Sequence, residues 1–218
     1  MTDHREILKR VGLAFVAFGL ADIAFMIHCI VKGQSYSSSF NIFAGAAGIF
    51  LIRGNLGATR LVTWFSAFIV TAFLGSILLL FPFLQPSGLF IAQIKHDPAS
   101  FAVLWLMAVV VLVLLGWAYR QLRSPPVLAA LQASGRTIAP PKLAFGLGIG
   151  LAAFLSIMLN MTLNGPAGDK AIELVRQELG PGYNYATQSL QWGGGHVSAV
   201  VAAYNDKEIK YVPVEWAE

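Results

Sequence analysis

The sequence predicts a membrane all-α helical bundle of five transmembrane helices, followed by a small C-terminal α+β domain outside the membrane. Three observations carry this prediction: a low content of charged residues, five apolar segments, and a change of composition after residue 163. Of the 218 residues, 56% are hydrophobic and 12% are charged, whereas a soluble domain normally carries about 25% charged residues. A chain with so little charge is typical of a protein that is solvated largely by lipid.

The five apolar segments are the candidate spans of a transmembrane domain at residues 12–163. A hydrocarbon core of about 30 Å requires roughly twenty helical residues at about 1.5 Å each. Four segments meet that length, and the first is also longer than the apolar core of a signal peptide, so we expect it to be retained. The second segment is short and begins with serines. The spans cover about residues 12–31, 36–52, 61–84, 101–119 and 143–163.

Lys and Arg lie on alternate sides of these spans. With five crossings and a cytoplasmic N-terminus at residues 1–11, the segments 53–60 and 120–142 also face inward. The inward segments carry Arg5, Lys9, Arg10, Arg53, Arg60, Arg120, Arg123, Arg136 and Lys142, whereas the two short outer loops carry Lys32 and Lys95. Without the second crossing, the segment 120–142 would face outward and the bias would reverse. The positive-inside rule therefore favours five crossings and an outward C-terminal domain.

The predicted topology also indicates where in the cell the protein lies. Short loops and a small size are typical of a multi-pass protein of the bacterial inner membrane. The N-terminus would then be cytoplasmic, and the C-terminal domain would be periplasmic or extracellular. The net charge of +4 is accounted for by the inward segments, so it does not indicate a nucleic-acid partner.

Two loops carry predicted structure of their own. In 120–142, Ser124 is expected to cap a short helix that ends at Gly135. The apolar side chains of this helix, among them Val127 and Leu131, predict a position on the inner membrane surface, with the loop's first arginines near lipid phosphates. The outer loop after the third span is too apolar for a free loop, so we expect it at the membrane interface or under the C-terminal domain.

The tail, residues 164–218, is predicted to be a small α-β-β-β domain. Residues 169–179 have the period of an amphipathic helix, and a Gly-Pro-Gly sequence ends it. Three strand-like segments follow at 183–192, 196–205 and 208–216, with turn residues between them. Because the third strand contains a proline, it is expected to be an edge strand or a bulged one.

A unit of about fifty residues buries little apolar surface alone. We therefore expect the tail to lean on the outer loop, on a partner protein, or on a second copy of itself. The candidate contact residues are Val212, Val214 and Trp216, which line one face of the third strand.

Asp22 is the only acidic residue inside any span, and an ionisable group near the middle of a span is costly. It could serve a proton or cation relay, or pair with a basic residue of a partner. The structural alternative is a protonated carboxyl group that hydrogen-bonds to Asn41, Ser66, Thr71 or Ser76 on a neighbouring helix. His28 lies about 240° round the same helix from Asp22, and we expect it to be a hydrogen-bonded residue at the outer interface.

Small residues recur at four-residue spacing in three spans. The fifth span has Gly146 and Gly150, the third has Ala67 and Gly75 with Thr71 between them, and the second has Ala44 and Gly48. Such faces let helices approach closely in lipid, either within one chain or between subunits. The glycines of the fifth span do not form a nucleotide loop, because no strand precedes them and no Lys-Ser/Thr follows.

The sequence indicates no catalytic residues, no cofactor and no metal site. His96, Asp97 and His196 all face outward, but scattered single ligands are weak evidence for a metal. The leading hypothesis is a non-enzymatic accessory, assembly or scaffold protein that binds the lipid bilayer and other membrane or periplasmic proteins, or a second copy of itself. The alternative is a small oligomeric transporter or channel that uses Asp22 as an intramembrane ionisable site.

The general plan of the chain resembles that of many small bacterial membrane proteins. This plan has short charged loops, a Gly/Ala second span that ends in Leu51-Ile52-Arg53-Gly54, and an exit from the fourth span at Trp117-Ala118-Tyr119-Arg120. The tail is similar in plan to small α-β-β-β domains on respiratory-chain assembly factors. No residue motif carries that likeness, so no site residue is transferred from it.

Overall fold

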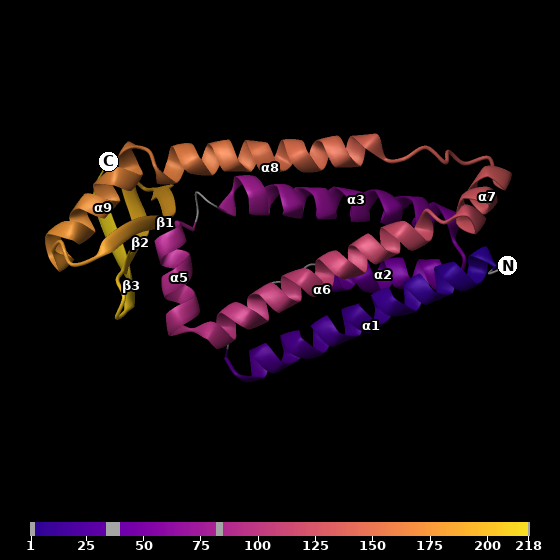
Figure 1. The fold of residues 1–218 in the computed structure, drawn as a ribbon, viewed down its shortest axis with the longest axis horizontal. Coiled ribbons are helices and arrows are strands. Elements are labelled where there is room, and N and C mark those ends of the chain that lie inside the picture. The colour runs from indigo at the N-terminus through magenta and orange to yellow at the C-terminus, as the bar shows by residue number, and fades with distance from the viewer. Residues whose placement is uncertain (1–2, 34–39, 82–84, 218) are drawn as a thin grey trace. The chain divides into compact units, whose positions relative to one another are not determined.

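The computed structural model describes residues 3–33, 40–81 and 85–217. This part of the chain contains eight helices and one three-stranded antiparallel sheet at the C-terminal end (Figure 1). The helices are α1 (His4–Val31), α2 (Phe40–Ile52), α3 (Leu56–Leu79), α5 (Ser87–His96), α6 (Pro98–Leu122), α7 (Pro125–Ala133), α8 (Lys142–Leu163) and α9 (Pro166–Leu179). The strands are β1 (Asn184–Gly193), β2 (His196–Tyr204) and β3 (Ile209–Ala217).

The chain divides into two compact units. Unit 1 comprises Met1–Val70 and Val110–Gly146, and unit 2 comprises Thr71–Val109 and Leu147–Glu218. The boundaries between the units fall within α3, α6 and α8, so each unit holds one part of each of these helices. The predicted division at 163/164 lies between α8 and α9.

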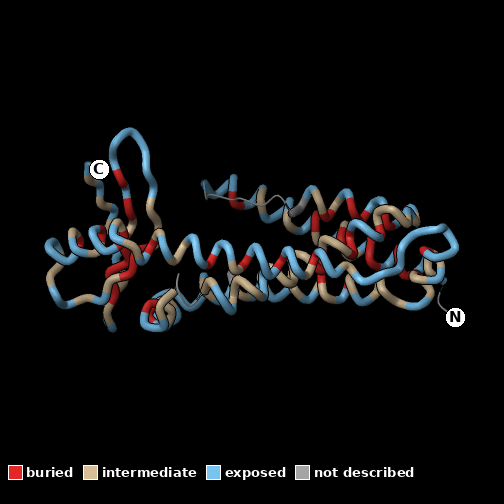
Figure 2. The backbone as a smooth tube through the Cα atoms, turned by 90° about the horizontal axis from the view of Figure 1, so that it is seen from above, coloured by how far each residue is buried: buried red, intermediate tan, exposed pale blue. Residues whose placement is uncertain are grey.

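Four helices, α1, α3, α6 and α8, are long and apolar enough to cross a membrane. Many positions along these helices are exposed in the isolated chain (Figure 2). Their large apolar side chains are among the exposed ones, for example Leu143 at 77% and Leu106 at 65%. Soluble monomeric proteins rarely expose apolar surface on this scale. The chain is therefore a membrane protein whose exposed helix faces suit contact with lipid.

The second predicted span is not confirmed by its length. α2 has 13 residues, which corresponds to about 20 Å of helix and is shorter than a hydrocarbon core of about 30 Å. Residues 36–39 of the predicted span lie outside the described residues.

The third helix begins five residues before the predicted span because Asn55 caps it. The side-chain Oδ1 of Asn55 accepts hydrogen bonds from the backbone N–H groups of Gly57 (2.8 Å) and Ala58 (3.2 Å). These donors have no partner inside the first helical turn. Gly54 precedes the cap at φ 72°, a left-handed conformation that favours glycine.

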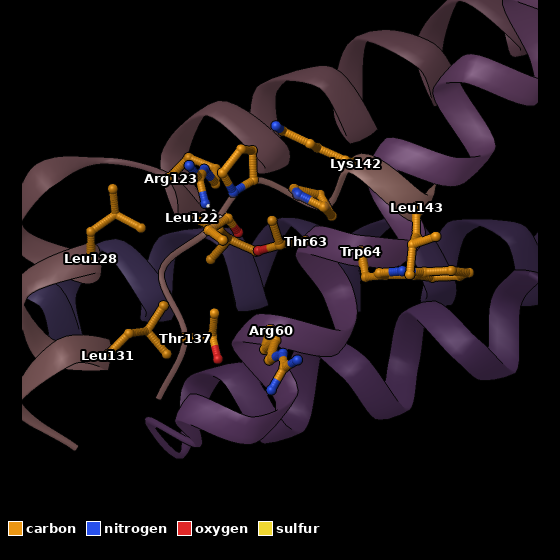
Figure 3. Close-up of a pocket in the computed structure, with 13 residues that line it drawn as sticks. Arg60, Thr63, Trp64, Leu122, Arg123, Leu128, Leu131, Thr137, Lys142 and Leu143 are labelled. Carbon is orange, nitrogen blue, oxygen red and sulfur yellow. Dashed lines mark hydrogen bonds between the residues drawn. The ribbon is translucent and has the colours of Figure 1, made fainter. Parts of the chain in front are cut away.

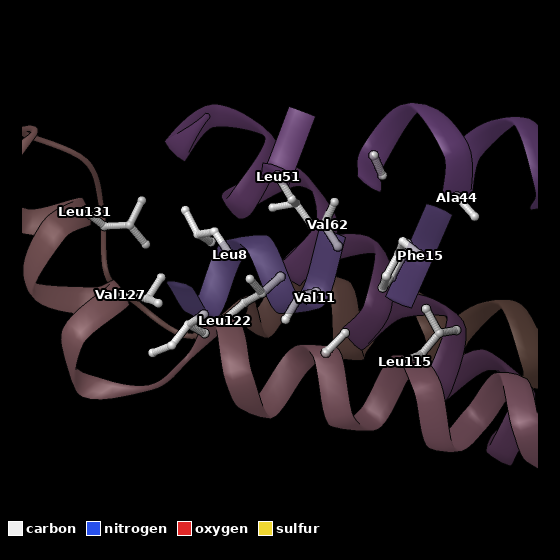
Figure 4. Close-up of a cluster of buried hydrophobic side chains, with 13 residues drawn as sticks. Leu8, Val11, Phe15, Ala44, Leu51, Val62, Leu115, Leu122, Val127 and Leu131 are labelled. Atoms are coloured by element: carbon white, nitrogen blue, oxygen red, sulfur yellow. The ribbon is translucent and has the colours of Figure 1, made fainter. Parts of the chain in front are cut away.

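The core of unit 1 lies where α1, α2, α3, α6 and α7 converge (Figure 4). Its largest fully buried side chains include Phe15, Leu8, Leu51, Leu115 and Leu122. The short helix α7 was expected to lie on the membrane surface, but Val127 and Leu131 are buried in this core. The apolar face of α7 therefore packs on protein, because α1 and the end of α6 supply a surface that sequence periodicity alone does not reveal.

Ser124 precedes α7 as predicted, but its hydroxyl does not cap the helix. Its side chain makes no capping hydrogen bond, and among the described residues its Oγ is buried without a hydrogen-bond partner. Pro125 and Pro126 have no N–H to donate, and the N–H of Val127 donates to the backbone carbonyl of Ser124 instead (3.1 Å). Gly135, at φ 71°, follows the end of the helix as expected.

The C-terminal sheet has the strand order β1-β2-β3, so β2 is central and the other two strands are edges. Side chains alternate between its two faces. One face packs against α9, and its core consists of Ala171, Val175, Ala199, Val201 and Ala203. The predicted α-β-β-β order is confirmed, and the strand boundaries differ from the prediction by one residue.

The helix α5 covers part of the opposite face of the sheet. Leu89 and Ala92 from this helix are buried with Ala186, Ala202 and Tyr204. A Cβ on Gly88 would lie 3.0 Å from the Tyr204 ring, so a glycine here lets the helix approach closely. The apolar outer loop thus forms a helix that supports the sheet. This agrees with the expectation that the loop lies under the C-terminal domain.

Candidate functional site

The β1–β2 hairpin end of the tail presents the most exposed aromatic side chain on the α9 face of the sheet. Gly194 and Gly195 form the two-residue turn, with φ 62° and 78°. Successive positive φ angles match a type I′ turn, whose twist suits a β-hairpin. The turn fixes the register that places Trp192 opposite Val197 and Val197 opposite Trp216.

Val197 is 2% exposed between these two tryptophans, whereas Trp192 is 51% exposed. Trp216 is half-buried, and the Lys170 ammonium lies 5.4 Å from the centre of its ring. On the other face of the hairpin end, His196 Nδ1 lies 3.8 Å from Glu215 Oε1. We call the group Trp192, Val197 and Trp216 the hairpin-end patch.

The predicted contact residues of β3 already have partners inside the domain. Val212, Val214 and Trp216 are half-buried and pack with the core of the α9 face. Of the three, Trp216 is at the same end of the sheet as the exposed Trp192, and Val197 of the central strand lies between them. Sequence reasoning identified this strand face but missed Trp192, which the Gly-Gly turn could have placed in register with Trp216.

A polar cluster fixes the opposite end of the sheet. Lys210 Nζ lies 2.7 Å from Glu208 Oε1 and donates to the Tyr183 hydroxyl at 2.9 Å, while that hydroxyl donates to Glu208. Hydrogen bonds from Lys210 and Tyr183 hold the pKa of Glu208 below its usual range. Hydrogen bonds from Lys210 to Glu208 and to the Tyr183 hydroxyl raise the pKa of Lys210. The cluster ties the start of β1 to the β2–β3 turn.

Further polar contacts join α5 to β3 and to the β2–β3 turn. Gln93 Nε2 donates to the Tyr211 hydroxyl at 3.1 Å, and Lys95 Nζ lies 3.6 Å from Asp206 Oδ1. Burial raises the pKa of Tyr204. The pKa of Asp97 is lowered by hydrogen bonds from the side chain and backbone N–H of Ser100, which places this carboxylate as a cap on α6.

Asp22 and His28, the predicted intramembrane polar residues, both lie on α1. Asp22 is half-buried and His28 is exposed. Ser66 is buried, and its hydroxyl has no hydrogen-bond partner among the described residues, so it is not the partner of Asp22. The side chain of Asn41, another predicted partner, lies outside the described side chains.

The small residues of the second and third spans lie at helix contacts. A Cβ on Gly48 would lie 2.6 Å from the Gly12 carbonyl oxygen, and one on Gly75 would lie 2.8 Å from the Ala152 Cβ. Ala44 and Ala67 are buried. Gly12 was not among the predicted packing residues, although it shares a helix face with Phe15 and Gly19, three and seven positions on, and all three are buried.

Gly146 and Gly150 do not lie at a helix contact within the described part of the chain, so their predicted packing role stays a prediction for contact between subunits. Both are exposed, and a Cβ on either would meet no atom within 4 Å among the described residues. The buried face of α8 carries Gly148, Ala152 and Ser156 instead. Since two residues correspond to about 200° round a helix, this face lies opposite the Gly146–Gly150 pair.

The predicted inward segments of unit 1 meet at one end of that unit. Ile52 packs against Gly12, and α7 packs with Leu8 near the start of α1. A Cβ on Gly57 would lie 2.9 Å from Arg136 Nη1. The N-terminal helix turn and the segments 53–60 and 120–142 are therefore neighbours, and we call this region the basic end.

Among the described residues, no group of three His, Cys, Asp or Glu side chains is placed to hold a metal ion. Comparison with protein-family models, with curated proteins and with solved structures gives no match.

Proposed function

We propose that the protein is a multi-pass accessory, assembly or scaffold protein of a bacterial inner membrane, and that its C-terminal domain binds another protein. The observation that carries this proposal is the exposed Trp192, 51% accessible beside Trp216 on a domain that is otherwise folded around its own core. Aromatic side chains are enriched at protein interfaces, and tryptophan is prominent among their energetic hot spots.

Side-chain contact is a better mode of binding for this domain than strand addition. The edge strand β1 is interrupted by a bulge between Thr187 and Ser189. The edge strand β3 contains Pro213, which has no N–H to donate. Bulges and prolines are common devices against edge-to-edge pairing, so we place the partner on the hairpin-end patch rather than along a strand edge.

We further propose five crossings, with the basic end in the cytoplasm and the tail on the other side. The packing of α2 on α1 supports the second crossing. Because Gly48 and Ile52 lie against Gly12, the C-terminal end of α2 returns to the N-terminal end of α1. If α1 crosses the membrane, Ile52 therefore lies at the depth of Gly12, on the side where α1 begins.

Purification of Trp192→Ala tests the proposed function. The full-length chain, extracted from its native membranes in mild detergent, is sized and its co-purifying proteins are quantified. Loss of a hot-spot side chain costs at least about 2 kcal/mol, or about thirtyfold in affinity, so we expect the variant to lose its stoichiometric partner. Its thermal stability should match the wild type, because the side chain is half-exposed.

The matched control is Gln191→Ala, the exposed neighbour on the opposite face of β1. This variant should retain the partner. Equal partner recovery with Trp192→Ala and with wild type contradicts the assignment. A homo-oligomer without other proteins, which Trp192→Ala dissociates, would identify the partner as a second copy of the chain.

A further inference from the structure

A cavity of about 440 Å³ opens at the basic end of unit 1 (Figure 3). Its walls come from the start of α3, the end of α6, α7, and the linker that leads into α8. Leu128 and Leu131 lie on one side of it, and Trp64 and Leu143 lie on the other.

Three cationic residues, Arg60, Arg123 and Lys142, line the same cavity, and no carboxylate does so among the described residues. The sequence has no Asp or Glu from residue 23 to residue 96 or from residue 98 to residue 168. Arg60 and Lys142 are exposed and form no ion pair within the described part of the chain. Among the described residues, no carboxylate therefore neutralises the positive charge of the cavity.

Arg123 connects the end of α6 to the linker that forms one wall of the cavity. Its Nη1 donates to the carbonyl oxygens of Ile138 (2.7 Å) and Ala139 (3.2 Å). These bonds anchor the linker beside α6 and leave the rest of the guanidinium group for other acceptors. Arginine presents several donors in a planar fork that matches the oxygens of a phosphate group.

We propose that this basic pocket binds an anionic phospholipid, with the phosphate between Arg60, Arg123 and Lys142 and the acyl chains against Trp64, Leu128 and Leu143. A lipid headgroup and free phosphate would both present phosphate oxyanions to these three cations. Basic pockets between membrane helices bind anionic headgroups, and the apolar walls favour a lipid over a free phosphate. The proposal is independent of the tail's protein partner and of the number of crossings.

Native mass spectrometry of the delipidated full-length protein tests the proposal with three probes. The probes are dioctanoyl-phosphatidylglycerol, dioctanoyl-phosphatidylcholine and inorganic phosphate. We expect the anionic lipid to bind at least tenfold more tightly than the other two. Phosphatidylcholine has the same phosphate group but carries a choline cation, so its equal binding overturns the preference for a net-anionic headgroup. Equal binding of inorganic phosphate overturns the lipid assignment.

A pair of double variants locates the site. Arg60→Gln with Lys142→Gln should weaken phosphatidylglycerol at least tenfold, since each cation near a lipid headgroup contributes about fivefold. Arg53→Gln with Arg120→Gln removes the same charge from exposed positions that do not line the pocket, and it should weaken binding less than twofold. An equal loss of phosphatidylglycerol affinity in both double variants overturns the assignment of the binding site to this pocket.

A single variant keeps the test decisive if the first double variant folds poorly. Thr137 is exposed and lines the pocket, so Thr137→Glu should preserve the fold and bring a carboxylate to the phosphate position. It should also weaken phosphatidylglycerol at least tenfold. Unchanged lipid affinity in Thr137→Glu overturns the proposal.

Discussion

Gly12 and Gly48 bring α1 and α2 into direct backbone contact. A Cβ on Gly12 would lie 2.6 Å from the carbonyl oxygen of Gly48, and a Cβ on Gly48 would lie 2.6 Å from that of Gly12. Neither position has room for a side chain, since the nearest obstructing atom at each is a backbone oxygen. In lipid, where apolar burial does not distinguish a helix from an acyl chain, such close packing is a main source of helix association.

Gly48→Ala is therefore expected to destabilise the α1–α2 hairpin. Overpacking a well-packed site costs about 1–3 kcal/mol. Gly45→Ala, in the same helix, is the matched control because a Cβ there meets no atom within 4 Å and alanine has the higher helix propensity. Thermal unfolding in detergent should show a lower Tm for Gly48→Ala alone, and equal melting of the two variants would refute the backbone contact.

Leu89→Ala is expected to loosen α5 from the sheet. Leu89 is fully buried against the Tyr204 side of the sheet, and removing a buried leucine side chain costs about 2–5 kcal/mol. Ile91, which is 51% exposed on the same helix, provides the control variant Ile91→Ala. Limited proteolysis of the purified protein should cut the tail faster only in Leu89→Ala; equal cutting rates would mean that α5 does not support the domain.

Asp22→Asn is expected to leave insertion, stability and partner recovery unchanged. The accessory role uses the tail, and asparagine preserves hydrogen-bonding capacity at this position. Expression level, Tm and co-purification report the three properties. Loss of the protein's function in the cell, with normal expression and Tm, would instead favour the transporter or channel hypothesis. Ion flux in reconstituted vesicles would then be the relevant assay.

The polar cluster at the β2–β3 turn predicts a pH dependence of local stability. The pKa of Glu208 is lowered in the folded state, so its contribution is present above its unfolded pKa, about 4.3, and is lost as pH falls through the folded value. The pKa of Lys210 is raised, so its contribution is lost only as pH rises through that raised value. The fraction of molecules in which the β2–β3 turn is open should therefore be constant between about pH 5 and pH 10 and should increase below about pH 5.

Hydrogen exchange of the β2–β3 turn, corrected for the intrinsic pH dependence of exchange, measures this opening. Glu208→Gln should remove the increase at low pH, because its side chain does not titrate. Glu215→Gln, on the other face of β3, should leave the increase intact. A low-pH increase that persists in Glu208→Gln would assign the effect to another group.

Local sequence signals predicted the tail well. The helix period and the Gly-Pro-Gly sequence placed α9, and the alternation of residues together with Gly194-Gly195 placed the hairpin. Each of these signals acts over a few neighbouring residues, so no tertiary information was needed. The face of the sheet on which α5 packs, and the exposure of Trp192, depend on contacts between elements far apart in sequence.

Helix-packing faces were harder to predict for a physical reason. Several faces of α8 carry small residues, and sequence spacing alone does not tell which face meets another helix. The structure buries Gly148 and Ala152 and leaves Gly150 exposed. Likewise, α7 is amphipathic whether its apolar face meets lipid or protein, so the burial of Val127 and Leu131 could not be read from their period.

The central claim is that the chain crosses the membrane five times, with its two ends on opposite sides. The side on which each chain end is accessible tests this claim most directly. In a variant with Cys29→Ala, Asp206→Cys and an N-terminal epitope, a membrane-impermeant maleimide and an antibody are applied to intact spheroplasts and to permeabilised ones. Five crossings predict that Asp206→Cys is labelled in intact spheroplasts, while the epitope is detected only after permeabilisation. Accessibility of both ends from the same side would contradict the account, because α2 would then not cross the membrane.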